Sequence, residues 1–187
     1  SVGRFKEDDL MAMFPSRKTL DGLANNGFTY ANRYEVEITI PNKSDQSTRE
    51  LNIRCESISI PGRNLRTVGD FNIYGPPIEV VQGNTFGEVS ASFYLSNDMS
   101  ERILMEEWQN TVINPETYDL SYYKEYTGGL KIFLLDRDKD ERRIYGVELF
   151  EVYPKAIEVI ALSHASTNTI NKLGVSFQYR NWKRLSV

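Results

Sequence analysis

The sequence offers few side chains for acid–base chemistry, and its single histidine, His164, is the first to consider. It lies in the polar segment 163–168, which we expect to be a turn between two strands. A nucleophilic serine that works with a histidine often sits on a sharp strand-to-helix turn, and no such motif accompanies His164. The pattern therefore favours a turn residue over a catalytic one.

An acidic run at residues 136–141 places carboxylates at alternate positions, as a calcium-binding loop does. Such a loop needs glycine at its sixth position and a carboxylate at its twelfth. Here these positions hold Glu141 and Val147, which favours a solvated hairpin tip. The glycines between 62 and 69 precede neither Lys-Ser/Thr nor a helix, so no phosphate loop is predicted. We expect no catalytic residue, no metal and no cofactor.

Cys55 is the only cysteine, which excludes an internal disulfide and a multi-thiolate metal site. We interpret it as a small apolar residue on a strand face. Tyrosines gather between residues 118 and 126, and such rings are able to stack on bases or sugars. Because Lys124 is the only basic residue among them and no basic cluster surrounds them, packing in the core or between subunits is favoured for Tyr118, Tyr122, Tyr123 and Tyr126.

Apolar and polar residues alternate with a period of two over most of the chain after Tyr30, which predicts half-buried strands. We expect the first two strands to form an antiparallel hairpin through the loop 41–45. One amphipathic helix is predicted between residues 97 and 114, with Asn97 or Asp98 as its N-cap. The predicted strands are 34–40, 51–56, 89–95, 130–135, 144–153, 157–161 and 173–179.

The fold class predicted from these elements is mainly β, an antiparallel β-barrel or sandwich with one amphipathic α-helix. We expect residues 1–27 to form an N-terminal arm and residues 28–187 to form the β-domain. Glycine and proline interrupt the segment 63–87, which predicts a long excursion of the kind that is usually functional or docked on a neighbour.

The bulk composition limits the possible partners. The chain has 187 residues and a formal charge of −4, from 26 acidic and 22 basic residues. This balance argues against a surface that grips nucleic acid phosphates. No apolar run reaches the ~20 residues that a membrane-spanning helix needs. The N-terminus lacks the apolar core of a signal peptide, so we expect synthesis in the cytoplasm.

Four local patterns carry a resemblance to a known family. They are the strand 32–38, the strand end 57–63, the strand–helix pair 89–94 and 103–109, and the C-terminal pair 147–157 and 175–182. In their order and spacing, over about residues 30 to 183, the chain resembles the tail tube proteins of contractile-tailed, T-even-type bacteriophages.

The resemblance implies a structural virion protein and no enzyme. Protomers of this family form hexameric rings, and each contributes strands to an inter-subunit barrel around a channel. Rings stack into a tube inside a contractile sheath, and genome DNA passes through the lumen without specific binding during ejection. The implied partners are further copies of the chain, the sheath protein, and baseplate and terminator proteins at the tube ends. The implied location is the virion tail, assembled in the host cytoplasm.

Three sets of residues follow as candidate sites. The polar strand faces are expected to line the lumen, since short or acidic side chains let a polyanion slide past. The outer face of the helix is expected to meet the sheath, and the excursion 63–87 to join stacked rings. The lumen set is Glu88, Ser90, Ser92, Ser176 and Gln178; the sheath set is Glu101, Arg102, Glu106, Glu107 and Gln109; the inter-ring set is Arg63, Arg66, Asp70, Tyr74 and Glu79.

Alternatives remain at two levels. Within the resemblance, the alternatives to the tail tube are a baseplate tube-initiator and the inner tube of a related contractile injection system, which sequence separates poorly. From another class, a monomeric β-barrel that binds a small ligand fits the strand pattern, although such barrels usually carry a secretion signal.

Overall fold

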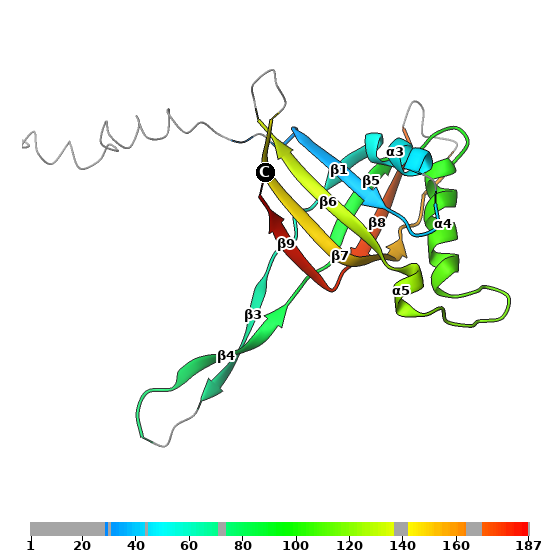
Figure 1. Ribbon diagram of the computed structural model, residues 1–187. Helices are drawn as coiled ribbons and strands as arrows, with labels where there is room; N and C mark the ends of the chain where they lie inside the picture. Colours follow the sequence, from blue (N-terminus) through cyan, green and yellow to red (C-terminus); the bar gives the residue numbers. More distant parts are fainter. Residues whose placement is uncertain are drawn as a thin grey trace, which may run out of the picture.

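The computed structural model describes residues 29, 31–43, 45–70, 74–136, 142–163 and 170–186. Its body consists of antiparallel strands in the order β1-β6-β7-β8-β5-β2, and β9 pairs with β7 outside this path (Figure 1). The prediction of a mainly β protein with antiparallel sheets is confirmed. The strands of the body are β1 (Tyr34–Thr39), β2 (Cys55–Ile58), β5 (Val89–Tyr94), β6 (Gly128–Leu135), β7 (Arg143–Ile157), β8 (Lys172–Gln178) and β9 (Asn181–Leu185).

The long strand β7 belongs to both sheets of the body. Its first part pairs with β6 and β9, and its last part, from Tyr153 to Ile157, pairs with β8. Between the two parts Glu151 has a positive φ of 56°, and the register shifts after Pro154. Such irregularities bend a strand, so β7 leaves one sheet and enters the other.

The barrel is not closed. Within the described residues β1 pairs only with β6, and β2 pairs only with β5, so the two end strands of the path are edges. Side chains bridge them instead. The Tyr34 hydroxyl donates to the carbonyl oxygens of Cys55 and Glu56, and the Ile38 N–H donates to Asn52 Oδ1 over 3.0 Å.

The inward-facing residues of the strands form one apolar core. In β5 the fully buried residues Val89, Ala91 and Phe93 alternate with more exposed ones, as the sequence predicted. The helix α4 (Ser100–Val112) buries Trp108 on this core, and the Trp108 indole donates to the Tyr126 carbonyl over 2.7 Å. The short helix α5 (Tyr123–Tyr126) follows it.

The excursion forms a two-stranded hairpin of β3 (Asn64–Asp70) and β4 (Ile78–Thr85). It projects from the body on the side away from α3 (Figure 1). Every described side chain of β4 is exposed. None of the helices in the described part of the chain is long and apolar enough to cross a membrane.

The predicted strand 51–56 is wrong in its first half, because the helix α3 (Asp45–Ile53) ends there, and only Cys55 and Glu56 lie in a strand, β2. Thr48 and Leu51 are buried three residues apart, which is the helical spacing, while Ile53 is 77% exposed. The following strand β2 pairs with β5 and not with β1, so the predicted hairpin is also wrong.

Smaller differences concern element ends. The N-cap residue of α4 is Met99, with φ 55°, and not Asn97 or Asp98 as predicted. The predicted strand 157–161 shares only Ile157 with β7. The arm 1–27, the hairpin tip 137–141 and His164 lie outside the described residues.

Candidate assembly surfaces

The polar faces of β5 and β8 form one surface, and it contains all five residues predicted for the lumen. The register pairs Ser90 with Ser176 and places Val89 opposite Phe177 on the core side. Because side chains alternate along a strand, Glu88, Ser92 and Gln178 share the face of Ser90 and Ser176. We call this the β5–β8 polar face. It is half-buried to exposed throughout.

Lysines accompany the acids on this face, which the sequence did not predict. Lys155 at the bulge of β7 pairs with Glu88, and Lys172 of β8 pairs with Glu56 of β2. Glu56 also accepts from Tyr94 Oη over 3.0 Å. The hydrogen bond from Lys172, together with those from Tyr94 and Ser92, holds the pKa of the Glu56 carboxyl below its usual value, against its partial desolvation.

Gly174 provides space at the centre of the same face. A Cβ at this position would lie 2.1 Å from the Glu158 carboxylate, so the absence of a side chain allows Glu158 to lie across β8. The Glu158 N–H donates to the Gly174 carbonyl over 2.8 Å. The centre of the β5–β8 polar face therefore consists of small residues, namely serine, glycine and alanine. Acidic and basic side chains surround them.

Glu101 does not belong to the outer face of the helix, contrary to our prediction. It is 3% exposed, and its carboxylate accepts from the Ser96 N–H over 2.9 Å and the Ser96 hydroxyl over 3.0 Å. Arg54 Nε lies 3.0 Å from the other oxygen. Burial alone would raise the pKa of Glu101, but the hydrogen bonds from Ser96 and the Arg54 charge hold it below its usual value.

The other helix residues predicted to meet the sheath divide into two kinds. Arg102 and Glu106 form an ion pair of 2.7 Å along the helix, and Glu107 pairs with Lys43. These charges lie at the surface. Gln109 is half-buried and donates to the Pro154 carbonyl over 3.3 Å, so it ties the helix to β7.

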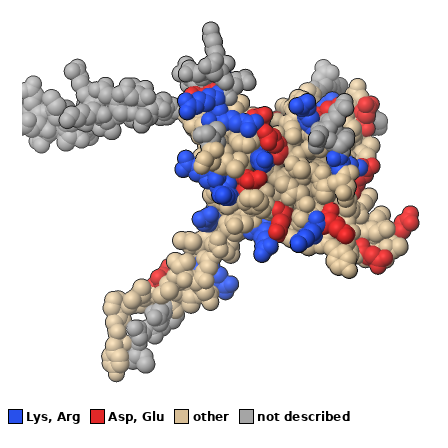
Figure 2. All heavy atoms as spheres, viewed as in Figure 1, with Lys and Arg blue, Asp and Glu red and all other residues tan. Residues whose placement is uncertain are grey.

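The hairpin carries the residues predicted to join rings. Arg63 lies at its base, with its guanidinium 4.9 Å from the ring centre of Trp182. Tyr74, near its tip, is 91% exposed, and Arg66 and Glu79 are exposed on its strands. The side chain of Asp70 lies outside the described residues. Figure 2 shows that most of the hairpin surface is uncharged.

Exposed apolar side chains also cover the hairpin strands. Such a dense set on a slender element is unusual for a surface that faces only water. They are Leu65, Val68, Ile78, Val80 and Val81, each between 46% and 61% exposed.

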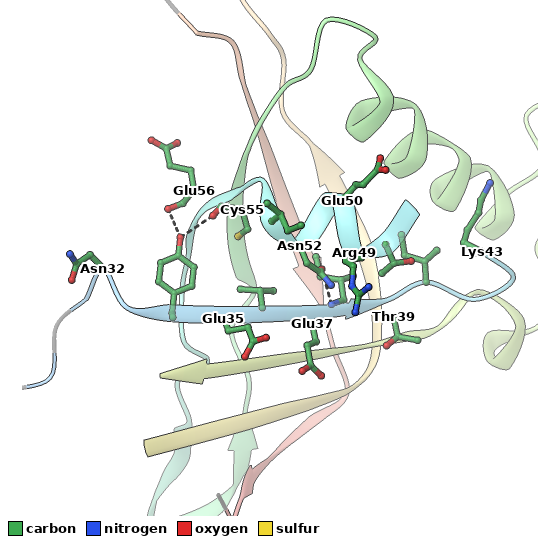
Figure 3. Close-up of a pocket in the computed structure, with 16 residues that line it drawn as sticks. Asn32, Glu35, Glu37, Thr39, Lys43, Arg49, Glu50, Asn52, Cys55 and Glu56 are labelled. Carbon is green, nitrogen blue, oxygen red and sulfur yellow. Dashed lines mark hydrogen bonds between the residues drawn. The ribbon is translucent and has the colours of Figure 1, made fainter. Parts of the chain in front are cut away.

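A groove between the two edge strands was not predicted. It has a volume of about 1330 Å³ and lies between β1, α3 and the start of β2 (Figure 3). Its wall contains Tyr34 and Cys55, and burial raises the pKa of each to about 12. The Tyr34 hydroxyl and the Cys55 thiol are therefore both neutral at physiological pH. Tyr34 contributes a hydrogen-bonding group to the wall of the groove, and Cys55 contributes an apolar one. Sequence reasoning missed the groove because it assigned the last turn of α3 to a strand and predicted no helix before it.

The tyrosine-rich segment has two environments. Tyr118 and Tyr122 are 79% and 82% exposed, whereas Tyr126 packs edge-on against Tyr123 and Tyr153. Tyr126 is half-buried and packs on other tyrosines outside the apolar core, so packing in the core is not shown for any of the four tyrosines, and packing between subunits stays a prediction. No cluster of three or more potential metal ligands occurs among the described residues.

Comparison with solved structures relates this fold to contractile particles. A chain of the anti-feeding prophage baseplate has a TM-score of 0.63 and 13% identity, with 85% of this chain and 96% of that chain covered. A chain of the sheath–tube complex of the extracellular contractile injection system PVC has a TM-score of 0.64 and 11% identity, with 89% and 97% covered. A chain of the anti-feeding prophage cap has a TM-score of 0.64 and 12% identity, with 86% of this chain and 93% of that chain covered.

These similarities concern the fold. No curated protein sequence matches the chain. The model of the phage tail tube protein family, however, matches residues 29–185, which is most of the chain. The protein belongs to the phage tail tube protein family.

Proposed function

We propose that this protein is the protomer of a tail tube, in which hexameric rings stack around a channel that conducts genome DNA during ejection. The observation that carries the proposal is the sheet β7-β8-β5-β2. In the part of the chain that the structure describes, this sheet has an edge without a neighbouring strand at each end and a continuous polar face, while its other face is buried in the core.

Ring closure follows from the two edges. Among the described residues, β2 pairs with no strand other than β5, and Tyr153–Ile157 of β7 pairs with no strand other than β8. Single side chains contact these edges: Tyr34 donates to the carbonyls of Cys55 and Glu56, and Gln109 donates to that of Pro154. An unpaired edge is a template for another strand, and closure of a sheet into a barrel removes it. The edge of β2 in one copy is therefore suited to pair with the end of β7 in the next copy.

The β5–β8 polar face would then line the lumen. A polyanion adheres to unpaired lysines through release of its counterions. Here Lys155 and Lys172 are each paired with a glutamate. Paired charges and short hydroxyl side chains support passage of DNA without specific binding.

The outer face of α4 is proposed to meet a sheath. Its charged residues Arg102, Glu106 and Glu107 lie at the surface, and Ile103 between them is 50% exposed. Exposed ion pairs contribute little to affinity, which suits a sheath that must move past the tube. Glu101 and Gln109 are excluded from this surface by their contacts within the protomer.

The position in the particle is proposed to be the tube itself. The solved relatives include baseplate and cap chains as well as a chain from a sheath–tube complex, so the fold serves several positions. The family model describes a tube protein, which supports the tube over a tube-initiator or an end protein. Assembly in the host cytoplasm and location in the tail follow from this role.

Negative-stain electron microscopy of the purified full chain tests the proposal. We expect six-fold rings and, at higher concentration, hollow tubes. Sedimentation velocity at several concentrations gives the same information in solution. A species that stays monomeric at high concentration would contradict the tube and favour the ligand-binding barrel.

A further inference from the structure

Two short segments, 60–63 and 86–88, join the β3–β4 hairpin to the body. We call them the hairpin junction. Among the described residues no backbone hydrogen bond links these segments to each other or to the body. The strands of the hairpin contact mainly each other. The backbone of the junction therefore does not by itself fix the direction in which the hairpin projects.

Each segment of the junction contains a glycine, Gly62 in the first and Gly87 in the second. A Cβ at either position would meet no atom within 4 Å, so packing does not hold the backbone there. Glycine also has more conformational freedom than any other residue. The junction has the properties of a hinge, and side-chain contacts are left to hold the hairpin in the direction that Figure 1 shows.

Two side-chain contacts cross the junction, one from each segment. The Arg63 guanidinium lies 4.9 Å from the centre of the Trp182 ring, within the range at which an aromatic face attracts a cation. The Phe86 ring packs on Tyr179, with 5.8 Å between the ring centres and an angle of 48° between the planes. Tyr179 directly follows β8 and Trp182 lies in β9, so both contacts end on the same connection of the body.

The body holds both rings through contacts of its own. Tyr179 is 3% exposed and belongs to the apolar core, and Trp182 packs against that core while its backbone pairs with Leu149 of β7. In the described part of the chain the Tyr179 hydroxyl has no hydrogen-bond partner. The contact with Phe86 is thus made by the ring of Tyr179 and not by its hydroxyl.

We propose that these two contacts fix the direction of the hairpin on the protomer before it joins a tube. Arg63, Phe86, Tyr179 and Trp182 are then positioning residues for assembly, an inference that rests on the proposed tube. A hairpin that already points in the correct direction loses little conformational entropy on assembly. Without the contacts only the fraction of protomers with that direction assembles, and the protein concentration needed for tubes rises in inverse proportion to this fraction.

Distances between two spin labels in the full-length protomer measure the direction of the hairpin. In a Cys55→Ala background, Ile78→Cys on β4 and Lys124→Cys on α5 supply exposed label sites on the hairpin and on the body. Below the concentration at which tubes form, we expect a narrow distribution of distances for this labelled protein.

Variants of the contacts then separate the ring from the hydroxyl. Arg63→Gln with Phe86→Leu removes the cation and the ring while keeping side chains of similar size, and it should broaden the distribution of distances. Tyr179→Phe is the matched control. It keeps the ring that contacts Phe86, so the distribution should stay narrow.

Tube formation gives the second readout. Arg63→Gln/Phe86→Leu should raise the protein concentration needed for tubes about tenfold, which corresponds to about 1.4 kcal/mol. Gly62→Ala with Gly87→Ala restricts the backbone of the junction, and alanine fits because neither glycine has a positive φ or a close neighbour. Adding these two changes to the contact variant should narrow the distances and lower the required concentration again. Loss of a contact to a neighbouring ring would not be restored in this way.

The outcomes separate this inference from the tube itself. A broad distribution with the native contacts present, or a narrow one in Arg63→Gln/Phe86→Leu, would overturn the role of the contacts even if tubes form. Tubes at the wild-type concentration from a contact variant with broad distances would overturn the role in assembly. Wild-type protein that forms neither rings nor tubes in electron micrographs would overturn the proposed function, and the role in assembly with it.

Discussion

Glu101 connects the start of α4 to the turn before it, through two hydrogen bonds from Ser96 and an ion pair with Arg54. The side chain is 3% exposed, so loss of its charge leaves donors without an acceptor in a buried place. We predict that Glu101→Gln lowers the free energy of unfolding by about 1.5–3 kcal/mol. Urea unfolding of the protomer at pH 7 measures this change.

The pH dependence of the same variant follows from the direction of the pKa shift. Because the folded pKa of Glu101 lies below its unfolded value, its stabilisation is full above the unfolded pKa, about 4.3, and declines as the pH falls through the folded pKa. The difference between wild type and Glu101→Gln should therefore shrink in acid. Glu106→Gln, at an exposed pair, should cost only about 0.3–0.5 kcal/mol and serves as control. Equal losses in both variants would contradict the buried role.

Gly128 is a second residue at which a small substitution should lower the stability of the protomer. A Cβ there would lie 2.1 Å from the Thr39 carbonyl oxygen and 3.0 Å from the Trp108 ring. We predict that Gly128→Ala destabilises the protomer by about 1–3 kcal/mol, because β1 and α4 must both move. Thermal unfolding measures it. Gly129→Ala is the control, since its nearest neighbour is 4.0 Å away, and a similar loss there would argue against the steric cause.

At the scale of elements, the hairpin β3–β4 contributes little to the protomer and much to assembly. Its strands contact mainly each other, and β4 is exposed along its length. We predict that replacing residues 64–85 with a short Gly-Ser linker leaves a folded protomer that no longer forms tubes. Circular dichroism checks the fold, and electron microscopy checks the tubes. Normal tubes from this deletion would contradict a role of the hairpin in stacking.

The helix α4 presents a different surface. Reversing two of its exposed acids, Glu106→Lys with Glu107→Lys, should preserve tubes and impair polymerisation of a sheath around them. The reason is that the change removes the charges proposed to face the sheath while α4 keeps its buried contacts. Co-assembly with the cognate sheath protein, followed by electron microscopy, measures this outcome. Normal sheath assembly would refute the sheath surface.

Two segments show when a sequence pattern is enough to predict a strand or a helix. Regular alternation over six residues predicted β5 correctly, because both its faces have a consistent environment. The segment around Leu51 and Ile53 alternates too, but over few residues a buried helix face gives the same pattern. The spacing of Thr48 and Leu51, both buried, was the helical signal. Likewise Glu101 shares a face with the buried residues Leu104, Met105 and Trp108, and this spacing could have excluded it from the outer surface.

The candidate surfaces depend on contacts between distant parts of the chain. Alternation alone assigned Ser90 and Ser176 each to the polar face of its own strand, and the register of β5 and β8 pairs them on one surface. The partners Lys155 and Lys172 could not be found in this way. Pairing of β7 with β8, and of β8 with β5, brings Lys155 to Glu88, and pairing of β5 with β8 and β2 brings Lys172 to Glu56. The groove was also out of reach, since it exists only where two edge strands approach without pairing.

At the scale of the whole molecule, the β5–β8 polar face gives a test of DNA passage. Glu88→Lys places two lysines together, because Lys155 loses its partner. We predict that particles with this variant form normal tubes and eject DNA more slowly. Dye-release kinetics of ejection measure the effect, and Ser90→Thr, which adds no charge, is the control. Unchanged ejection would contradict a lumen on this face.

The sharing of β7 between both sheets has a mechanical consequence. β7 is hydrogen-bonded to β6 and β9 in one sheet and to β8 in the other. A load that pulls one sheet past the other therefore acts along a single covalent backbone instead of across a layer of side chains. Backbone ladders loaded in this direction must break several hydrogen bonds together, so the protomer resists shear as one stiff body when a particle drives its tube forward.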